Sequence, residues 1–202
     1  MYSISLGLFA GALHVVSGPD HLTAVAPLNI KPSLPGFAYG LLWGLGHSAG
    51  VCVIGLLFCF FRESDVMHQI SMGSEKLVGI GLVYLGIKGI QMLCKPGMLQ
   101  EQSTHSQGSR KGLALGFGVL HGSAGAHHLI GLLPLLSLGE STQILLYIFA
   151  YCSGTVIAMC GFSHLFHRFT NHLITRNKSN FKKLMIASSV SSLMIGSIWL
   201  IY

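Results

Sequence analysis

The chain has 202 residues, of which 51% are hydrophobic and only 9% are charged. A soluble domain carries about 25% charged residues, and a disordered chain is much less apolar, so the composition excludes both classes. We therefore predict an all-α integral membrane protein in a lipid bilayer. The glycine-rich phosphate-binding motifs of nucleotide-dependent enzymes are missing. The formal net charge of +6 is explained by orientation in the bilayer, so no nucleic-acid partner is expected.

Six transmembrane helices are predicted, because six stretches reach the about 20 mostly apolar residues that cross roughly 30 Å of hydrocarbon. Backbone groups in lipid must bond within their own segment, which favours helices. The predicted spans cover residues 3–28, 36–61, 72–94, 112–138, 142–166 and 184–202. The first span has no basic leading segment and no clear cleavage site, so we expect no removable signal peptide there.

Lysine and arginine are distributed very unequally over the loops. One set of alternate loops and adjoining span ends holds ten of them, whereas the other set holds only Arg62 and Lys76. The ten are Lys31, Lys88, Lys95, Arg110, Lys111, Arg168, Arg176, Lys178, Lys182 and Lys183. Because basic loops stay in the cytoplasm, we predict both termini outside (N-out, C-out), cytoplasmic basic loops and a location in the cell membrane, plasma or inner.

An internal repeat relates the two halves of the sequence. At a constant offset of 107 positions, ten of the 23 residues of segment 6–28 recur in segment 113–135, two histidines and a proline among them. Weaker similarity follows, because AGVCVI after His47 resembles SGTVIA after Tyr151, and LGI of the third span resembles IGS of the sixth. Since three helices are an odd number, the second copy enters the membrane from the opposite side, as in secondary transporters with inverted repeats. The predicted units are two inverted three-helix repeats, 1–94 and 112–202, joined by a cytoplasmic linker, 95–111.

Six of the 11 histidines and a single aspartate lie inside the predicted spans, away from their ends. A charged group costs up to about 3 kcal/mol there, so such residues mark pathways or sites. Imidazole with one carboxylate suits a borderline divalent transition metal, whereas calcium or magnesium takes more oxygen ligands. The candidate metal ligands are His14, Asp20, His21, His47, His121, His127 and His128. The Asp20 carboxylate also offers a hydrogen-bond partner that would fix a histidine tautomer.

A break in the first span is predicted between two of these ligands. His14 and His21 would lie about 10.5 Å apart along an unbroken helix, too far to bind one ion. Proline lacks an N–H group and glycine tolerates unusual dihedral angles, so the segment between them can bend. The predicted hinge residues are Ser17, Gly18, Pro19 and Gly125. A break would bring His14, Asp20 and His21 together. Alternatively, the helices stay intact and two successive sites form, each pairing one histidine of the first span with one of the fourth.

The segment HVVSGPDHL (residues 14–22), with GHS (46–48) and SGT (153–155), resembles the nickel/cobalt permeases, and most of all the UreH-like branch of the NicO group of urease-accessory membrane proteins. The signature of the classical permeases is H-x2-D-x-D-H or a close form. His14, Asp20 and His21 match its first histidine and its terminal D-H, with one residue inserted. The inner aspartate is missing, and Ser17 lies nearest to it. The longer histidine-rich loop of the efflux members is absent too, which favours uptake.

The residues and the resemblance together predict a secondary transporter of Ni²⁺ or Co²⁺, with its site between the first and fourth helices and no prosthetic group. No enzyme is expected, because H-E-x-x-H is missing; a membrane metalloenzyme and a metal-binding accessory subunit are the alternatives. The superfamily's thiol-disulfide electron carriers place a cysteine in each repeat-related helix, whereas the first and fourth spans here have none. The resemblance also implies nickel-enzyme maturation proteins as partners, and a homo-oligomer stays open.

Overall fold

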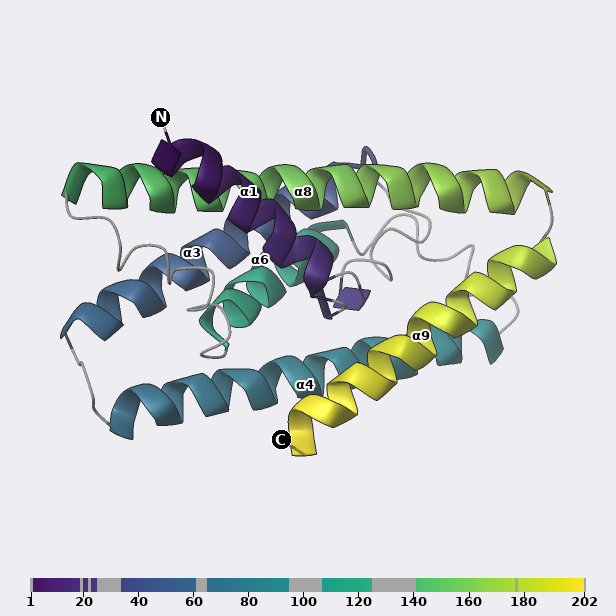
Figure 1. Cartoon of the computed structure of the whole chain (residues 1–202). Helices are drawn as coiled ribbons and strands as arrows, with labels where there is room; N and C mark the ends of the chain where they lie inside the picture. Colours follow the sequence, from purple (N-terminus) through teal and green to yellow (C-terminus); the bar gives the residue numbers. More distant parts are fainter. Residues whose placement is uncertain are drawn as a thin grey trace.

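The computed structural model describes residues 2–18, 20–21, 23–24, 34–60, 65–94, 107–124, 141–176 and 178–201. Within these ranges the chain forms six α-helices and no β-strand. In chain order the helices are α1 (Tyr2–Ser17), α3 (Ala38–Phe60), α4 (Asp65–Cys94), α6 (Gln107–Ser123), α8 (Ser141–Arg176) and α9 (Lys178–Ile201) (Figure 1). The all-α prediction is thereby confirmed for the described part of the chain.

Several helix ends differ from the predicted spans. α1 ends at Ser17 and α6 at Ser123, well before the predicted ends at 28 and 138, because hydropathy alone does not register where an apolar segment leaves the helical conformation. α8 continues to Arg176 and α9 begins at Lys178, since polar residues can extend a helix beyond its apolar stretch. α6 begins at Gln107, so residues 107–111 of the predicted linker are helical.

Two helices of the described part are long and apolar enough to cross a membrane. The qualifying segments are Thr142–Leu173 in α8 and Lys182–Ile201 in α9. The apolar helices Tyr2–Ser17 and Ala38–Ile54 are shorter. At 1.5 Å per residue, the 16 residues of α1 measure about 24 Å, which is less than the roughly 30 Å of hydrocarbon. The two long segments indicate a membrane location, and the number of six spans stays a prediction.

The helices pack in pairs whose members are far apart in sequence. α1 lies against α8, α3 against α6, and α4 against α9. In Figure 1, α8 and α4 form two long rods, α1 crosses α8, α9 crosses α4, and α3 and α6 lie between the rods. α3 also contacts α8. The buried side chains of Val15, Trp43 and Met159 pack together where α1, α3 and α8 meet.

Glycine lets α3 and α6 touch backbone to backbone. A Cβ atom at Gly118 of α6 would collide with the carbonyl oxygen of Trp43, and one at Gly122 would collide with the carbonyl oxygen of His47. Small residues permit this close approach between helices in membranes. The contact determines how near His47 of α3 lies to His121 of α6.

In the described part of the chain, several polar side chains are buried, and many large apolar side chains are exposed on the surface. Ser163 Oγ donates a hydrogen bond to the Gly36 carbonyl (2.6 Å), and Ser192 Oγ donates one to the Leu82 carbonyl (2.8 Å); both serines are fully buried. The outward residues of α8 include Leu145, Phe149, Ile157 and Leu165, which are 65–74% exposed. Extended apolar surface of this kind marks contact with a membrane or another protein.

Candidate metal centre

The chain turns back on itself directly after α1. α1 ends at Ser17, Gly18 lies outside the helix, and Asp20 and His21 are helical again. A Cβ atom at Gly18 would collide with the His21 ring and lie 2.7 Å from Asp20 Oδ1, so this approach requires glycine. His14 Nε2 and His21 Nε2 are consequently 3.1 Å apart, although an unbroken helix would separate these residues by about 10.5 Å along its axis.

The C-terminal turns of two helices supply histidines to the same place. His14 lies in the last turn of α1 and His121 in the last turn of α6. A helix C-terminus carries a partial negative charge of about half an elementary charge, which stabilises a nearby cation. Together with the carboxylate of Asp20, the two helix ends give this region an electrostatic field suited to a positive ion.

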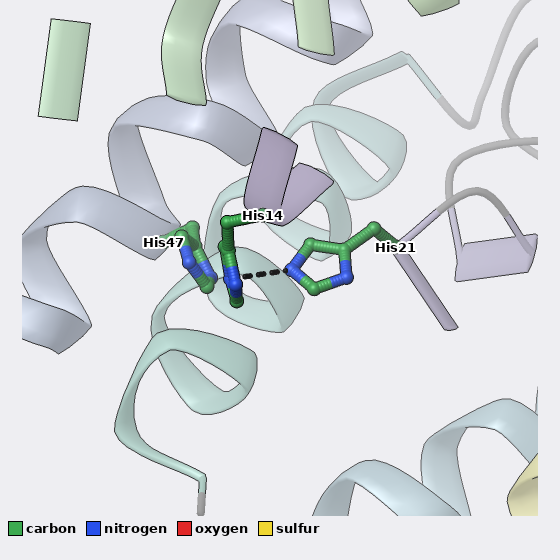
Figure 2. A group of neighbouring side chains, drawn as sticks. All are labelled: His14, His21 and His47. Carbon is green, nitrogen blue, oxygen red and sulfur yellow. Dashed lines mark hydrogen bonds between the residues drawn. The ribbon is translucent and has the colours of Figure 1, made fainter. Parts of the chain in front are cut away.

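Four imidazoles and one carboxylate gather here, from the α1 end, α3 and α6. These five residues, the His/Asp cluster, are His14, Asp20, His21, His47 and His121. The ring centroids of His21 lie 4.6 Å from those of both His14 and His121, and the His47 centroid lies 5.4 Å from that of His14. Figure 2 shows His14 between the other two rings, with its contact to His21 dashed. His21, His47 and His121 are at most 2% exposed, so water has little access to them.

Asp20 determines which nitrogen carries the proton on two rings. Its Oδ1 accepts a hydrogen bond from His21 Nδ1 (3.0 Å), and its Oδ2 lies 3.0 Å from His121 Nε2. A carboxylate only accepts, so both of these nitrogens carry a proton. On a neutral His21 the lone pair is therefore on Nε2, where His14 Nε2–H donates to it. Carboxylates orient metal-binding imidazoles in the same manner.

Two overlapping groups within the cluster have the donor atoms for a metal ion. One group is His14, His21 and His47, and the other is Asp20, His21 and His121; within each group the ligand atoms lie within 4.8 Å of one another. Tetrahedral ligands about 2.1 Å from an ion are about 3.4 Å apart, so shifts of roughly 1 Å close either group around an ion. Imidazole nitrogens suit nickel, zinc, copper and iron.

Two tryptophans line the His/Asp cluster, and neither was predicted as a site residue from the sequence. Trp43 is fully buried and stacks on His47, with ring centroids 5.1 Å apart and planes 7° apart. The Trp199 ring of α9 lies 5.4 Å from that of His121. Trp43 precedes His47 by four positions, a spacing that puts both on one helix face, so its role could have been found from sequence. Trp199 is brought in only by the packing of α9.

Of the seven predicted metal ligands, the structure brings five together in the His/Asp cluster. His127 and His128 lie outside the described residues, as do the hinge candidates Pro19 and Gly125. The alternative with an intact first helix does not match the described geometry, because His14 and His21 meet.

The fold and this site together define a protein that is all-helical in its described part, with two segments long and apolar enough to cross a membrane and a buried candidate metal centre. No protein-family model matches the chain, and no solved structure is similar to it. The chain is 31% identical over 173 residues to the urease accessory protein UreH of Bacillus sp. (strain TB-90), and the match covers 80% of this chain and 75% of UreH. The chain belongs to the UreH family.

Two plant proteins are also similar to it. The chain is 32% identical over 200 residues to the Arabidopsis thaliana chloroplast protein FOR GROWTH AND FERTILITY 2, and 30% identical over 206 residues to FOR GROWTH AND FERTILITY 1. Each match covers 94% of this chain but only 54% and 56% of the respective relative. The chain thus spans about half the length of these two relatives.

Proposed function

We propose that this chain is a membrane permease for divalent transition-metal ions, with Ni²⁺ or Co²⁺ as its cargo. The observation that carries this proposal is the buried His/Asp cluster at the C-terminal ends of α1 and α6. The name of UreH, a urease accessory protein, agrees with the nickel cargo that the resemblance to nickel/cobalt permeases implies. Nickel-enzyme maturation proteins are the proposed partners.

The composition of the cluster suits an ion that must be bound and then released. Imidazoles are neutral ligands and the single carboxylate of Asp20 supplies one negative charge, so a divalent ion is only partly neutralised. Conduction requires a site that is favourable enough to enter and weak enough to leave. The two helix ends contribute only partial charges, which adds attraction without a second full anion.

The helix pairing supports the inverted repeat. In the predicted repeat α1 corresponds to α6, α3 to α8 and α4 to α9. Exchanging the two halves therefore converts the α1–α8 contact into the α6–α3 contact and leaves the α4–α9 contact unchanged. These three contacts are the principal helix pairs of the described structure. At the residue level, Gly11 against the Tyr151 carbonyl corresponds to Gly118 against the Trp43 carbonyl. Gly11 and Gly118 are related by the offset of 107 positions found in the sequence. This correspondence pairs Trp43 of α3 with Tyr151 of α8. It differs by four positions, about one helical turn, from the sequence alignment of AGVCVI with SGTVIA in the same two helices.

The crossing of α4 and α9 supports the same repeat. A Cβ atom at Gly86 would lie 2.8 Å from the Ser189 carbonyl oxygen, and one at Gly196 would lie 2.8 Å from the Gly79 carbonyl oxygen. Gly86 and Gly196 are the glycines of LGI and IGS, the segments that align between the third and sixth predicted spans. We propose six spans with both termini outside and cytoplasmic basic loops. α1 and α6 then enter the bilayer as short helices that end at the cluster, as discontinuous helices do in transporters.

Metal flux tests the proposal directly. Proteoliposomes containing the wild type, His21→Ala or His164→Ala are compared for uptake of nickel, cobalt, zinc and manganese, and metal content is measured in cells that express each variant. His164 lies exposed on α8, outside the cluster, so His164→Ala is the matched control. We expect nickel or cobalt flux in the wild type and the control, and its loss in His21→Ala. Equal flux of all four metals in His21→Ala and the wild type contradicts the proposal.

A second candidate is a membrane-bound metal-binding subunit that passes metal to a partner without transport. The word "accessory" in the name of UreH favours it, because an accessory protein acts on behalf of another. Saturable Co²⁺ binding by the purified chain, with no flux in proteoliposomes, identifies this second function.

A further inference from the structure

His21 belongs to both metal-ligand groups, and it turns a different nitrogen toward each. Its Nε2 lies 3.1 Å from His14 Nε2, whereas its Nδ1 lies 3.0 Å from Asp20 Oδ1. The group with His14 and His47 and the group with Asp20 and His121 therefore lie on opposite sides of one imidazole ring.

A neutral imidazole has a lone pair on one nitrogen and a proton on the other, so His21 ligates an ion on only one side at a time. We propose that the His/Asp cluster holds a single ion in either of two mutually exclusive positions. The imidazole position consists of His14, His21 and His47; the carboxylate position consists of Asp20, His21 and His121. This proposal rests on the proposed metal transport and describes how the ion passes through the site.

The protons balance between the two positions. With the ion at the imidazole position, His21 holds its proton on Nδ1 and His121 holds its proton on Nε2, both facing Asp20. With the ion at the carboxylate position, an Asp20 oxygen, His21 Nδ1 and His121 Nε2 are ligands. The His21 proton is then on Nε2, facing His14, and the His121 proton is on Nδ1. Each ring carries one proton in both arrangements, so the transfer itself neither releases nor takes up a proton.

The two positions differ in ligand chemistry, which makes them distinguishable. The imidazole position offers three nitrogens, and the carboxylate position offers two nitrogens and a harder, charged oxygen. Nickel and copper favour nitrogen ligands, whereas manganese favours oxygen. Trp43 packs against His21, His47 and His121, with ring centroids 5.1–5.4 Å away, so it borders both positions.

Co²⁺ binding to the purified full-length chain tests the proposal, with affinity read by titration and the ligand set read by cobalt absorption and X-ray absorption spectroscopy. His47→Ala removes only the imidazole position, and His121→Ala removes only the carboxylate position. We expect each single variant to keep Co²⁺ binding. Its association constant should fall about twofold where the wild type populates the two positions equally, because removing one of them then halves that constant. The ligand sets should then differ, with a carboxylate oxygen beside two imidazole nitrogens in His47→Ala and imidazole nitrogens only in His121→Ala. His21→Ala and the double variant His47→Ala/His121→Ala should both lose this binding.

Three results overturn the two-position proposal. One is a loss of about 100-fold or more in both single variants, which indicates one joint site. Another is one Co²⁺ more per chain in the wild type than in His47→Ala, which indicates two ions at once. The third is an identical ligand set in both single variants. Unchanged helical circular dichroism verifies that the variants are folded, and His164→Ala serves as the control. Nickel or cobalt flux through the wild-type protein in proteoliposomes is measured independently. If the wild type transports metal, any of these three results contradicts the two-position proposal alone and leaves the proposed transport function standing.

Discussion

Replacing Asp20 with asparagine separates the role of its charge from the role of its shape. The Asp20 side chain is 13% exposed, and its carboxylate faces His21 Nδ1 and His121 Nε2, each at 3.0 Å. An asparagine amide has one accepting oxygen and one donating nitrogen. It can therefore accept from one of the two rings only, and the other ring must move its proton to its opposite nitrogen.

The stability of the metal-free protein should change little. A hydrogen bond to a charged group contributes about 1.5–3 kcal/mol and a neutral one about 0.5–1.5 kcal/mol, so the two contacts together lose roughly 2–3 kcal/mol. Burial of a carboxylate costs several kcal/mol in return, and Asp20→Asn removes that cost. Metal affinity has no such compensation. Loss of an orienting carboxylate weakens metal binding about 10–100-fold, which corresponds to about 1.4–2.8 kcal/mol.

Tryptophan fluorescence provides the assay without a label. The chain contains two tryptophans, and both lie beside the His/Asp cluster, Trp43 on His47 and Trp199 near His121. Bound Co²⁺ is paramagnetic and absorbs visible light, so it quenches neighbouring indoles. Titration of the wild type, Asp20→Asn and His164→Ala gives three dissociation constants, and thermal unfolding of the metal-free proteins gives their midpoints.

The reasoning is refuted if Asp20→Asn binds Co²⁺ within about twofold of the wild type, because the carboxylate would then neither orient the rings nor attract the ion. A large drop in the unfolding midpoint of metal-free Asp20→Asn, without a matching change in affinity, also contradicts it. That result would assign Asp20 a structural role instead.

Two further substitutions test the backbone contacts that shape the site. Gly122→Ala drives a Cβ atom into the His47 carbonyl and should destabilise the protein by about 1–3 kcal/mol. The control Gly116→Ala, in open space on the same helix, should stabilise the protein by up to about 1 kcal/mol. Equal thermal unfolding midpoints for the two variants contradict the α3–α6 contact. In Gly18→Ala the new methyl group collides with the Asp20 carboxylate and the His21 ring, so Co²⁺ affinity should fall at least about tenfold. Wild-type Co²⁺ affinity in this variant would show that the turn tolerates a side chain.

The amino-acid sequence by itself determined the helical class, the offset of 107 positions and the residues of the first helix that bend toward one another. These features are local or periodic. Apolar length predicts a helix, and Gly18 beside a proline predicts the point at which a helix ends. The first helix does end at Ser17, and His14 and His21 lie close together for that reason.

Only the tertiary structure decided how His47 and His121 join these residues and which nitrogen of His21 faces which partner. Both depend on α3 and α6 touching through glycine, a contact between segments about 70 positions apart that no local pattern encodes. The same packing places Trp43 and Trp199 against the cluster. Hydropathy therefore locates the histidines along the chain, and close backbone packing converts them into two ligand groups that share one ring.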